Sequence, residues 1–399
     1  DSKKIRGEFG YQMRSGNHFR LFCTRQACDF SRELPVQIVD EELYRDPPTL
    51  LFGTVDKFAM LPWNGEIGNF FAVENNNRAP ELIIQDELHL ISGPLGTIVG
   101  LYESAIDALC RKKGSITKIV ASTATIRRAV EQCAALYDRD VRQFPHPALD
   151  AEDSFFARES KIDYANGIYG RKYIGLMPSG KTKAMMEIRS IAALLQKAKD
   201  MDIPDDIRDK FWTVTAYYNS LKDLGKASTM VDDDVKDFMK RMCFRLKSSS
   251  DVRSIGTADE LTSRLTTTEL NRTLDKLEKM EYSAENIKNR VFPANIVLAT
   301  NMISVGIDVA RLNVMLLVGQ PKLTSEYIQA SSRVGREYPG MAFVMYDGGK
   351  SRDRSHYEQF RPYHESFYKY VEPTGATPFS EPARKRALHA VLIAYLRLS

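Results

Sequence analysis

Short runs of apolar, mostly β-branched residues recur along the chain and end in polar residues. One run, at residues 82–84, follows a proline and stops at Asp86. Apolar runs of this length without alternation are typical of strands in a parallel sheet, whose two faces are both covered. The same pattern predicts further strands at residues 49–52, 118–121, 172–177, 294–299, 314–318 and 342–347.

Stretches with apolar residues at helical spacing lie between these runs. They predict helices at residues 93–111, about 181–199, 326–335 and 382–398. Residues 201–290 are charged and mostly helical in pattern, which we interpret as a helical insertion. Residues 145–168 contain Pro145 and Pro147 and predict a connection between domains. Strands alternating with helices on both sides of this connection predict an α/β protein with two parallel-sheet domains.

Composition narrows the class of protein. The chain has 399 residues, 43% of them hydrophobic and 27% charged, and a net charge of +4, which permits a nucleic-acid partner without requiring one. Five scattered cysteines favour a reducing compartment. There is no signal peptide, and no apolar stretch approaches the roughly 20 residues of a membrane span, so we expect a cytoplasmic protein without membrane contact. Because the first residue is Asp1, we expect a fragment of a longer chain.

Asp86 and Glu87 are adjacent carboxylates that directly follow the predicted strand at residues 82–84. In open α/β sheets, ligands bind beyond the carboxyl ends of the strands. Nucleotide hydrolysis needs one carboxylate to hold Mg²⁺ and a second to orient and deprotonate a water molecule. The alternative is a solvated turn after an edge strand.

Hydroxyl groups follow the next predicted strand, and guanidinium groups lie near the end of a predicted helix. The strand at 118–121 runs into Ser122, Thr123 and Thr125, which we expect at the same sheet edge as Asp86, although threonine also has a simple β-propensity. Arg333 and Arg336 are three apart on the predicted helix and so share a face, where they could stabilise transition-state charge or form surface ion pairs.

Residues 175–182 match the phosphate-loop pattern G-x-x-x-x-G-K-[ST], on a predicted strand–loop–helix. The motif follows Glu87 by a long interval, and Pro178 removes an N–H group from the cradle. We therefore interpret Ser179 and the helix start as contacts to a nucleic-acid phosphate. A phosphate-loop ATPase centred on Lys181 is the minority interpretation.

Cys23 and Cys28 lie in a polar N-terminal stretch that predicts irregular structure. Their spacing fits half of a zinc site, and a complete site needs four ligands. The alternative is two ordinary thiols in a loop. Residues 357–370 are rich in aromatic side chains, which could stack on bases or pack against the second domain.

Four ordered segments, residues 86–89, 123–125, 300–308 and 329–336, resemble motifs II, III, V and VI of superfamily 2 helicases. Residues 53–59, 85–102, 300–307 and 355–379 further resemble the helicase subunit of DISARM anti-phage systems, and this likeness covers most of the chain.

The resemblance implies two RecA-like domains that bind ATP between them and single-stranded nucleic acid across both. Their expected bounds are residues 1–150 for part of the first domain, with a small cysteine-containing insertion, 160–350 for the second domain, with the insertion at about 201–290, and 351–399 for an aromatic and helical extension. By the same resemblance, Asp86 holds Mg²⁺, Glu87 activates water, and Arg333 and Arg336 act as arginine fingers. The other implied residues are His89, Thr123, Thr125, Gly306, Asp308 and Gln329 for ATP, and Thr54, Ser179, Thr300 and Asn301 for nucleic acid.

The family's own phosphate loop, expected upstream of Asp86, is not in this sequence, and we expect it on an N-terminal part outside it. The resemblance implies an ATP-dependent DNA helicase or translocase in phage defence, with DNA and a second defence-system subunit as partners. The alternatives are a non-hydrolysing nucleic-acid-binding scaffold and an RNA-directed helicase, because backbone contacts do not select the sugar.

Overall fold

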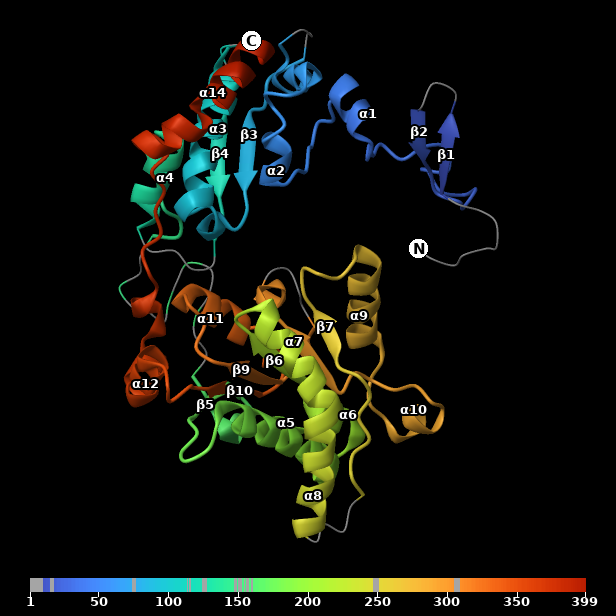
Figure 1. The fold of residues 1–399 in the computed structure, drawn as a ribbon. Coiled ribbons are helices and arrows are strands. Elements are labelled where there is room, and N and C mark those ends of the chain that lie inside the picture. The colour runs from blue at the N-terminus through green and yellow to red at the C-terminus, as the bar shows by residue number, and fades with distance from the viewer. Residues whose placement is uncertain are drawn as a thin grey trace. The chain divides into compact units, whose positions relative to one another are not determined.

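The computed structural model divides the chain into two compact units (Figure 1). The first unit comprises residues 1–144 and 373–399, and the second comprises residues 145–372. The structure describes residues 10–14, 18–73, 77–112, 114, 116–123, 128–146, 149, 153, 155, 158, 161–246, 251–304 and 309–399.

The second unit is built on a six-stranded sheet in which every strand pair is parallel, in the order β5-β10-β9-β6-β8-β7. The sheet confirms the predicted α/β class. Its strands are β5 (Arg171–Leu176), β6 (Val214–Tyr218), β7 (Asp259–Leu261), β8 (Ile296–Ala299), β9 (Val314–Val318) and β10 (Gly340–Met345).

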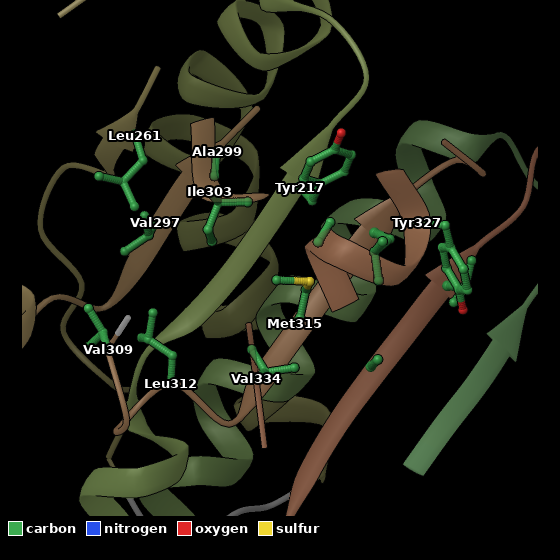
Figure 2. Packing of buried hydrophobic residues seen from close by; sticks show 14 of the residues in the cluster. Tyr217, Leu261, Val297, Ala299, Ile303, Val309, Leu312, Met315, Tyr327 and Val334 are labelled. Atoms are coloured by element: carbon green, nitrogen blue, oxygen red, sulfur yellow. The ribbon is translucent and has the colours of Figure 1, made fainter. Parts of the chain in front are cut away.

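Helices cover both faces of this sheet, as parallel strands require. The face that carries Ala216 and Leu316 packs on α5 (Lys183–Asp200), α7 (Leu221–Met230), the π-helical η4 (Val231–Val235) and α8 (Lys236–Leu246). The face that carries Tyr217 and Met315 packs on α9 (Thr267–Lys279), α11 (Thr324–Ser331) and α13 (Phe360–Glu365), as Figure 2 shows for Tyr327 of α11.

The remaining elements of the second unit are short. They are η3 (Tyr164–Asn166), α6 (Asp205–Trp212), α10 (Ala284–Lys288), η5 (Asn301–Ser304), α12 (Ser351–Glu358) and η6 (Phe367–Tyr370). The predicted aromatic segment packs within this unit, because Tyr363 is buried in the same core as Tyr327.

Residues 201–290 are mostly helical, but the prediction that they form an insertion is wrong. They contain β6, which lies between β9 and β8 inside the sheet, and the edge strand β7. All five residues of β6 are buried, so both of its faces need apolar or aromatic side chains. Its run is short, contains Thr215 and lies in a charged stretch, so its pattern does not tell a buried strand from a buried helix face.

The first unit contains a two-stranded parallel sheet, β3 (Leu82–Gln85) with β4 (Lys118–Ala121), packed on the long helix α3 (Gly93–Arg111). The C-terminal helix α14 (Glu381–Leu398) packs on α3 and completes this core. The other elements are β1 (Tyr11–Arg14), β2 (His18–Leu21), α1 (Asp40–Arg45), α2 (Val55–Phe58), η1 (Gly65–Phe71), η2 (Leu88–Leu90) and α4 (Ala129–Tyr137).

Three local predictions for the first unit are corrected. Residues 49–52 form no strand and are exposed, and α2 begins after Thr54. The N-terminal stretch is not wholly irregular, because β1 and β2 form an antiparallel hairpin. The predicted burial of β3 and β4 holds for one sheet face only, since Leu82, Ile84 and Val120 are 51%, 67% and 43% exposed.

Within the described part of the chain, none of the helices combines the length and apolar character needed to cross a membrane. The predicted C-terminal extension is divided between the units. Residues up to Glu372 pack with the second unit, and residues from Pro373 onward pack with the first.

Candidate functional site

Asp86 lies directly beyond the end of β3 and is fixed by the neighbouring strand. Its Oδ1 atom accepts hydrogen bonds from the Ser122 hydroxyl at 2.5 Å and from the Glu87 amide at 2.9 Å. Ser122 follows β4, which pairs with β3 in parallel, so both residues emerge at one sheet edge, as predicted. The Ser122 hydrogen bond, followed by that of the Glu87 amide, lowers the pKa of Asp86 below its ordinary value. Asp86 is therefore an exposed carboxylate held in its ionised form.

Glu87 has φ 50° and ψ 48°, a left-handed conformation that is rare for residues with a side chain. Such a conformation costs on the order of 1 to 3 kcal/mol and persists only where surrounding contacts enforce it. Here the Leu88 amide donates to the Ser122 carbonyl at 2.9 Å, which fixes the chain immediately after the turn. The turn allows both neighbouring carboxylates to lie at the edge of the sheet.

His89 connects the acidic turn to the next strand end. Its Nδ1 atom lies 3.2 Å from Glu87 Oε2 and 3.1 Å from Thr123 Oγ1, and its side chain is buried. The ring therefore fixes the Glu87 carboxylate relative to β4. The resemblance implied roles for both His89 and Thr123, and the structure brings these residues together.

Gln132, on α4, supports the same turn and was not singled out from the sequence. It is 1% exposed, and its Nε2 donates to the carbonyls of Ile91 at 2.7 Å and Leu88 at 3.3 Å. A lone glutamine on an amphipathic helix carries no sequence signal for such a role. Ser122 was noticed only as one of several hydroxyl residues after β4.

The acidic turn has the donor set that a hard divalent cation prefers. Asp86 presents an ionised, exposed carboxylate in which one oxygen is already oriented by two hydrogen bonds. Its Oδ2 accepts no hydrogen bond from any residue that the structure describes. Asp86 therefore fits Mg²⁺, which binds through one or two carboxylates together with substrate phosphates and water.

Arg333 and Arg336 lie in the second unit, but the prediction that they share a helical face is wrong. Helix α11 ends at Ser331, and both arginines lie in the turns that follow. The Ser332 hydroxyl donates back to the Gln329 carbonyl at 2.8 Å, and Gly335 adopts φ 69°. The left-handed conformation of Gly335 prevents a helix from continuing through to Arg336. Gln329 is on α11 itself.

The segment after α11 is nevertheless held firmly. Arg171 of β5 donates to the carbonyls of Ser332 at 3.2 Å and Val334 at 2.6 Å. Gly335 approaches the Gly340 backbone so closely that a Cβ atom at Gly335 would lie 2.7 Å from the Gly340 Cα. A side chain at either glycine would displace this segment. The arginines are thus carried on a fixed loop, with Arg336 exposed.

The predicted nucleic-acid contacts differ in accessibility. Ser179 in the loop after β5 and Asn301 after β8 are exposed, whereas Thr300 is only 5% exposed. Ser179 and Asn301 both follow strand ends at the carboxyl edge of one parallel sheet. Four strand spacings separate β5 from β8, which corresponds to roughly 19 Å. Thr54, in the first unit, is exposed at the start of α2.

The phosphate-loop-like segment forms a strand, loop and helix, as its sequence predicts. Gly175 lies within β5, and Thr182 is the N-cap of α5, where its hydroxyl accepts from the Met185 amide at 3.2 Å. Lys181 precedes this cap. Three other predicted nucleotide-binding residues, Thr125, Gly306 and Asp308, lie outside the described residues.

Cys23 and Cys28 are free, partly exposed thiols in the turn after β2. The Arg25 backbone amide and then the Cys28 thiol lower the pKa of Cys23. In the part of the chain that the structure describes, no three His, Cys, Asp or Glu side chains are grouped so as to hold a metal ion. The zinc half-site remains a prediction.

The fold and these motif positions are similar to those of superfamily 2 helicases. The family model for the helicase conserved C-terminal domain matches residues 248–337. The structure of the DUF1998 helicase MrfA bound to DNA and AMPPNP has a TM-score of 0.60 over 89% of this chain and 42% of that chain, at 13% identity. The structure of Mss116p bound to ssRNA and AMP-PNP has a TM-score of 0.51 over 88% of this chain and 57% of that chain, at 12% identity.

A curated sequence gives a more particular likeness. Over 95% of its length, the chain is 41% identical to the DISARM protein DrmA of Bacillus paralicheniformis (strain ATCC 9945a / NCIMB 11709 / CD-2). The chain spans 36% of the length of that relative. The resemblance inferred from the sequence, both to superfamily 2 helicases and to the DISARM helicase subunit, is confirmed.

Proposed function

We propose that the protein is an ATP-driven DNA translocase or helicase that acts in bacterial anti-phage defence beside a second protein subunit. The observation that carries the proposal is the acidic turn, in which Asp86 is held ionised and Glu87 is fixed by His89. The likeness to DrmA supports the defence role. The DNA and AMPPNP bound in the MrfA structure support DNA and a nucleotide as ligands.

In this proposal, each group of side chains has one task. Asp86 would hold Mg²⁺, which would neutralise the charge that develops on the γ-phosphoryl group of ATP. Glu87 orients a water molecule and takes its proton, and His89 keeps that carboxylate in place. Arg333 and Arg336 stabilise charge on the transferring group, because guanidinium groups match phosphate geometry. Ser179 and Asn301 bind the nucleic-acid backbone.

A DNA-stimulated ATPase assay on the full-length protein tests the proposal. Glu87→Gln should lower kcat by at least about a hundredfold while ATP still binds, because the amide cannot accept the proton. Glu81→Gln is the matched control: Glu81 lies on the same strand segment, is exposed and pairs only with exposed Arg78 among the described residues. It should hydrolyse ATP as the wild type does.

The rival functions give different results in the same assay. If Lys181→Ala abolished ATP binding and turnover while Glu87→Gln spared both, the loop at residues 175–182 would be the nucleotide site. A wild-type protein that binds DNA without hydrolysing ATP would be a scaffold. Stimulation by RNA but not by DNA of matched sequence would make the protein an RNA helicase.

A further inference from the structure

The chain returns from the second unit to the first through residues 372–377, which form an extended strap without regular structure. Both ends of this strap are bonded to segments that carry candidate site residues. We propose that Glu372, Thr374 and Gln132 are positioning residues that link the segment carrying Arg333 and Arg336 to the acidic turn. This inference rests on the proposed function.

At its first end, the strap holds the start of α11. Leu323, the N-cap residue of α11, has no side-chain hydrogen-bonding group. Glu372 supplies the cap from 48 residues away: its Oε1 and Oε2 accept from the Thr324 amide at 3.0 and 2.8 Å, and Oε1 also accepts from the Thr324 hydroxyl at 3.1 Å. A carboxylate at a helix N-terminus is favoured by the helix dipole as well as by these bonds.

Helix α11 transmits this anchor to the arginines. Tyr327, at its middle, is held by His364 Nε2 at 2.7 Å from the hydroxyl. Ser331, at its end, is held by the Tyr173 hydroxyl at 3.1 Å. A short helix fixed at its start, middle and end moves as one body. Its N-terminal anchor therefore helps to set where Arg333 and Arg336 lie.

At its second end, the strap holds the acidic turn. The Thr374 hydroxyl donates to Gln132 Oε1, and the Nε2 of the same Gln132 donates to the carbonyls of Leu88 and Ile91. The Gly93 amide donates to the Gly375 carbonyl at 2.8 Å, and the Thr377 amide donates to the Thr97 hydroxyl at 3.1 Å. Gln132 is buried with both ends of its amide bonded, so a change at Thr374 leaves a buried acceptor without its donor.

Only Pro373 separates the two anchors. Two peptide units span at most roughly 7 Å between the Cα atoms of Glu372 and Thr374. The proline also fixes one backbone dihedral angle of this link. The short link therefore limits how far the start of α11 can separate from Thr374 and, through Gln132, from the loop that follows Asp86 and Glu87.

The test lengthens the strap while keeping both anchors. Gly-Ser-Gly-Ser inserted between Glu372 and Pro373 should lower kcat of the DNA-stimulated ATPase of the full-length protein about tenfold or more, because misplacement by an ångström can cost a hundredfold. The KM for ATP should change less than about twofold, because the groups that bind ground-state nucleotide are untouched. The same insertion between the exposed residues Val291 and Phe292 is the control and should leave both constants unchanged.

Point variants supply a second measurement if the insertion prevents folding. Thr374→Val removes the hydroxyl at nearly constant volume and should lower kcat, whereas Thr374→Ser keeps the hydroxyl and should restore it. A wild-type rate in both the insertion and Thr374→Val would overturn the coupling and leave the proposed function standing. Equal losses in Thr374→Val and Thr374→Ser would also overturn it. A wild-type protein without ATPase activity would overturn the proposed function, and the coupling with it.

Discussion

At the scale of single residues, backbone strain and hydrogen bonding act together in the acidic turn to position the carboxylates of Asp86 and Glu87. Glu87 adopts a conformation that costs free energy, and the contacts of Ser122 and His89 maintain it. The Ser122 hydroxyl orients the Asp86 carboxylate and is the main cause of its lowered pKa. We therefore expect substitutions around this turn to change chemistry more than stability.

Ser122→Ala tests this expectation through the pH dependence of turnover. The hydroxyl is the main cause of the lowered pKa of Asp86, so its removal should raise that pKa towards the ordinary value. The acidic limb of the kcat/KM profile should then move to higher pH, because Asp86 is protonated earlier as pH falls. Ser104→Ala, whose hydroxyl bonds to the Gly100 carbonyl and to no other residue that the structure describes, should leave the profile unchanged. An unmoved limb in Ser122→Ala would contradict the role given to Asp86.

Glu103, on α3, has a raised pKa, in contrast to Asp86, and gives a prediction for the pH dependence of stability. Burial, followed by the nearby Asp107, raises the pKa of Glu103 from 4.5 to about 7. Its contribution to stability is complete below pH 4.5 and is lost as pH rises through 7. Glu103→Gln should therefore gain about 1 to 2 kcal/mol over wild type between pH 5 and pH 8. Urea unfolding at pH 5 and pH 8 measures the difference in unfolding free energy between Glu103→Gln and wild type. The same difference at both pH values would contradict the prediction.

At the scale of elements, a buried ion pair joins helices of the second unit. Asp209 of α6 and Arg311 before β9 are both nearly fully buried and bonded through both oxygens of Asp209, with Nε–Oδ2 at 3.1 Å. Arg311 also donates to the Leu277 carbonyl of α9, and Asp209 accepts from the Tyr282 amide. The pair thus fixes α6 and α9 beside the sheet that supports β8 and its Asn301.

Removing one partner of this ion pair should lower the free energy of unfolding more than neutralising both partners does. Arg311→Met leaves a buried, uncompensated carboxylate and should cost about 3 to 5 kcal/mol of unfolding free energy. The double variant Arg311→Met, Asp209→Asn removes the charge and keeps an acceptor for the Tyr282 amide. It should recover part of the loss. Denaturant unfolding of both variants measures the difference, and a double variant less stable than Arg311→Met would contradict this account.

At the scale of the whole molecule, the first unit is assembled from two distant parts of the chain. Helix α14 contributes Ala394 and Leu398 to the core that holds Leu109 of α3. The acidic turn therefore depends on residues that follow the entire second unit in sequence. The strap at residues 372–377 is the continuation of this arrangement.

Ala394→Asp should unfold the first unit selectively. Ala394 is fully buried, so a charged side chain there should cost at least about 3 kcal/mol, whereas Leu396→Asp is a matched control at a position 65% exposed. Limited proteolysis should cut residues 10–144 in Ala394→Asp and spare residues 161–372. Equal resistance of both units in Ala394→Asp would show that α14 does not hold the first unit together.

The sequence predicted those features that depend on local pattern. The helix at 93–111, the strands at β3, β4 and β9, and the meeting of Asp86 with Ser122 follow from apolar runs and from the common edge of parallel strands. The central strand β6 was missed because its short run contains Thr215 and lies in a charged stretch of helical pattern, where periodicity does not tell a buried strand from a buried helix face. The early end of α11 was missed because the segment after Ser331 is held by contacts remote in sequence, from Arg171 and from Gly340.

The partners of Gln132 and Glu372 could not be predicted, because each bonds to segments remote in sequence. Glutamine and glutamate on a helix or in a loop are ordinary surface residues until the fold buries or recruits them. The resemblance supplied the roles of Gly306, Asp308 and Thr125, which stay predictions, as do Thr300 and Thr54 as nucleic-acid contacts.

The divided first unit also bears on synthesis. A ribosome releases the chain from its N-terminus, so all of residues 145–372 emerge before α14 does. The second unit can then reach its native state while α3 still presents its apolar side to solvent or to a chaperone. The core that supports the acidic turn is thus completed only after the second unit has emerged, once α14 has left the exit tunnel.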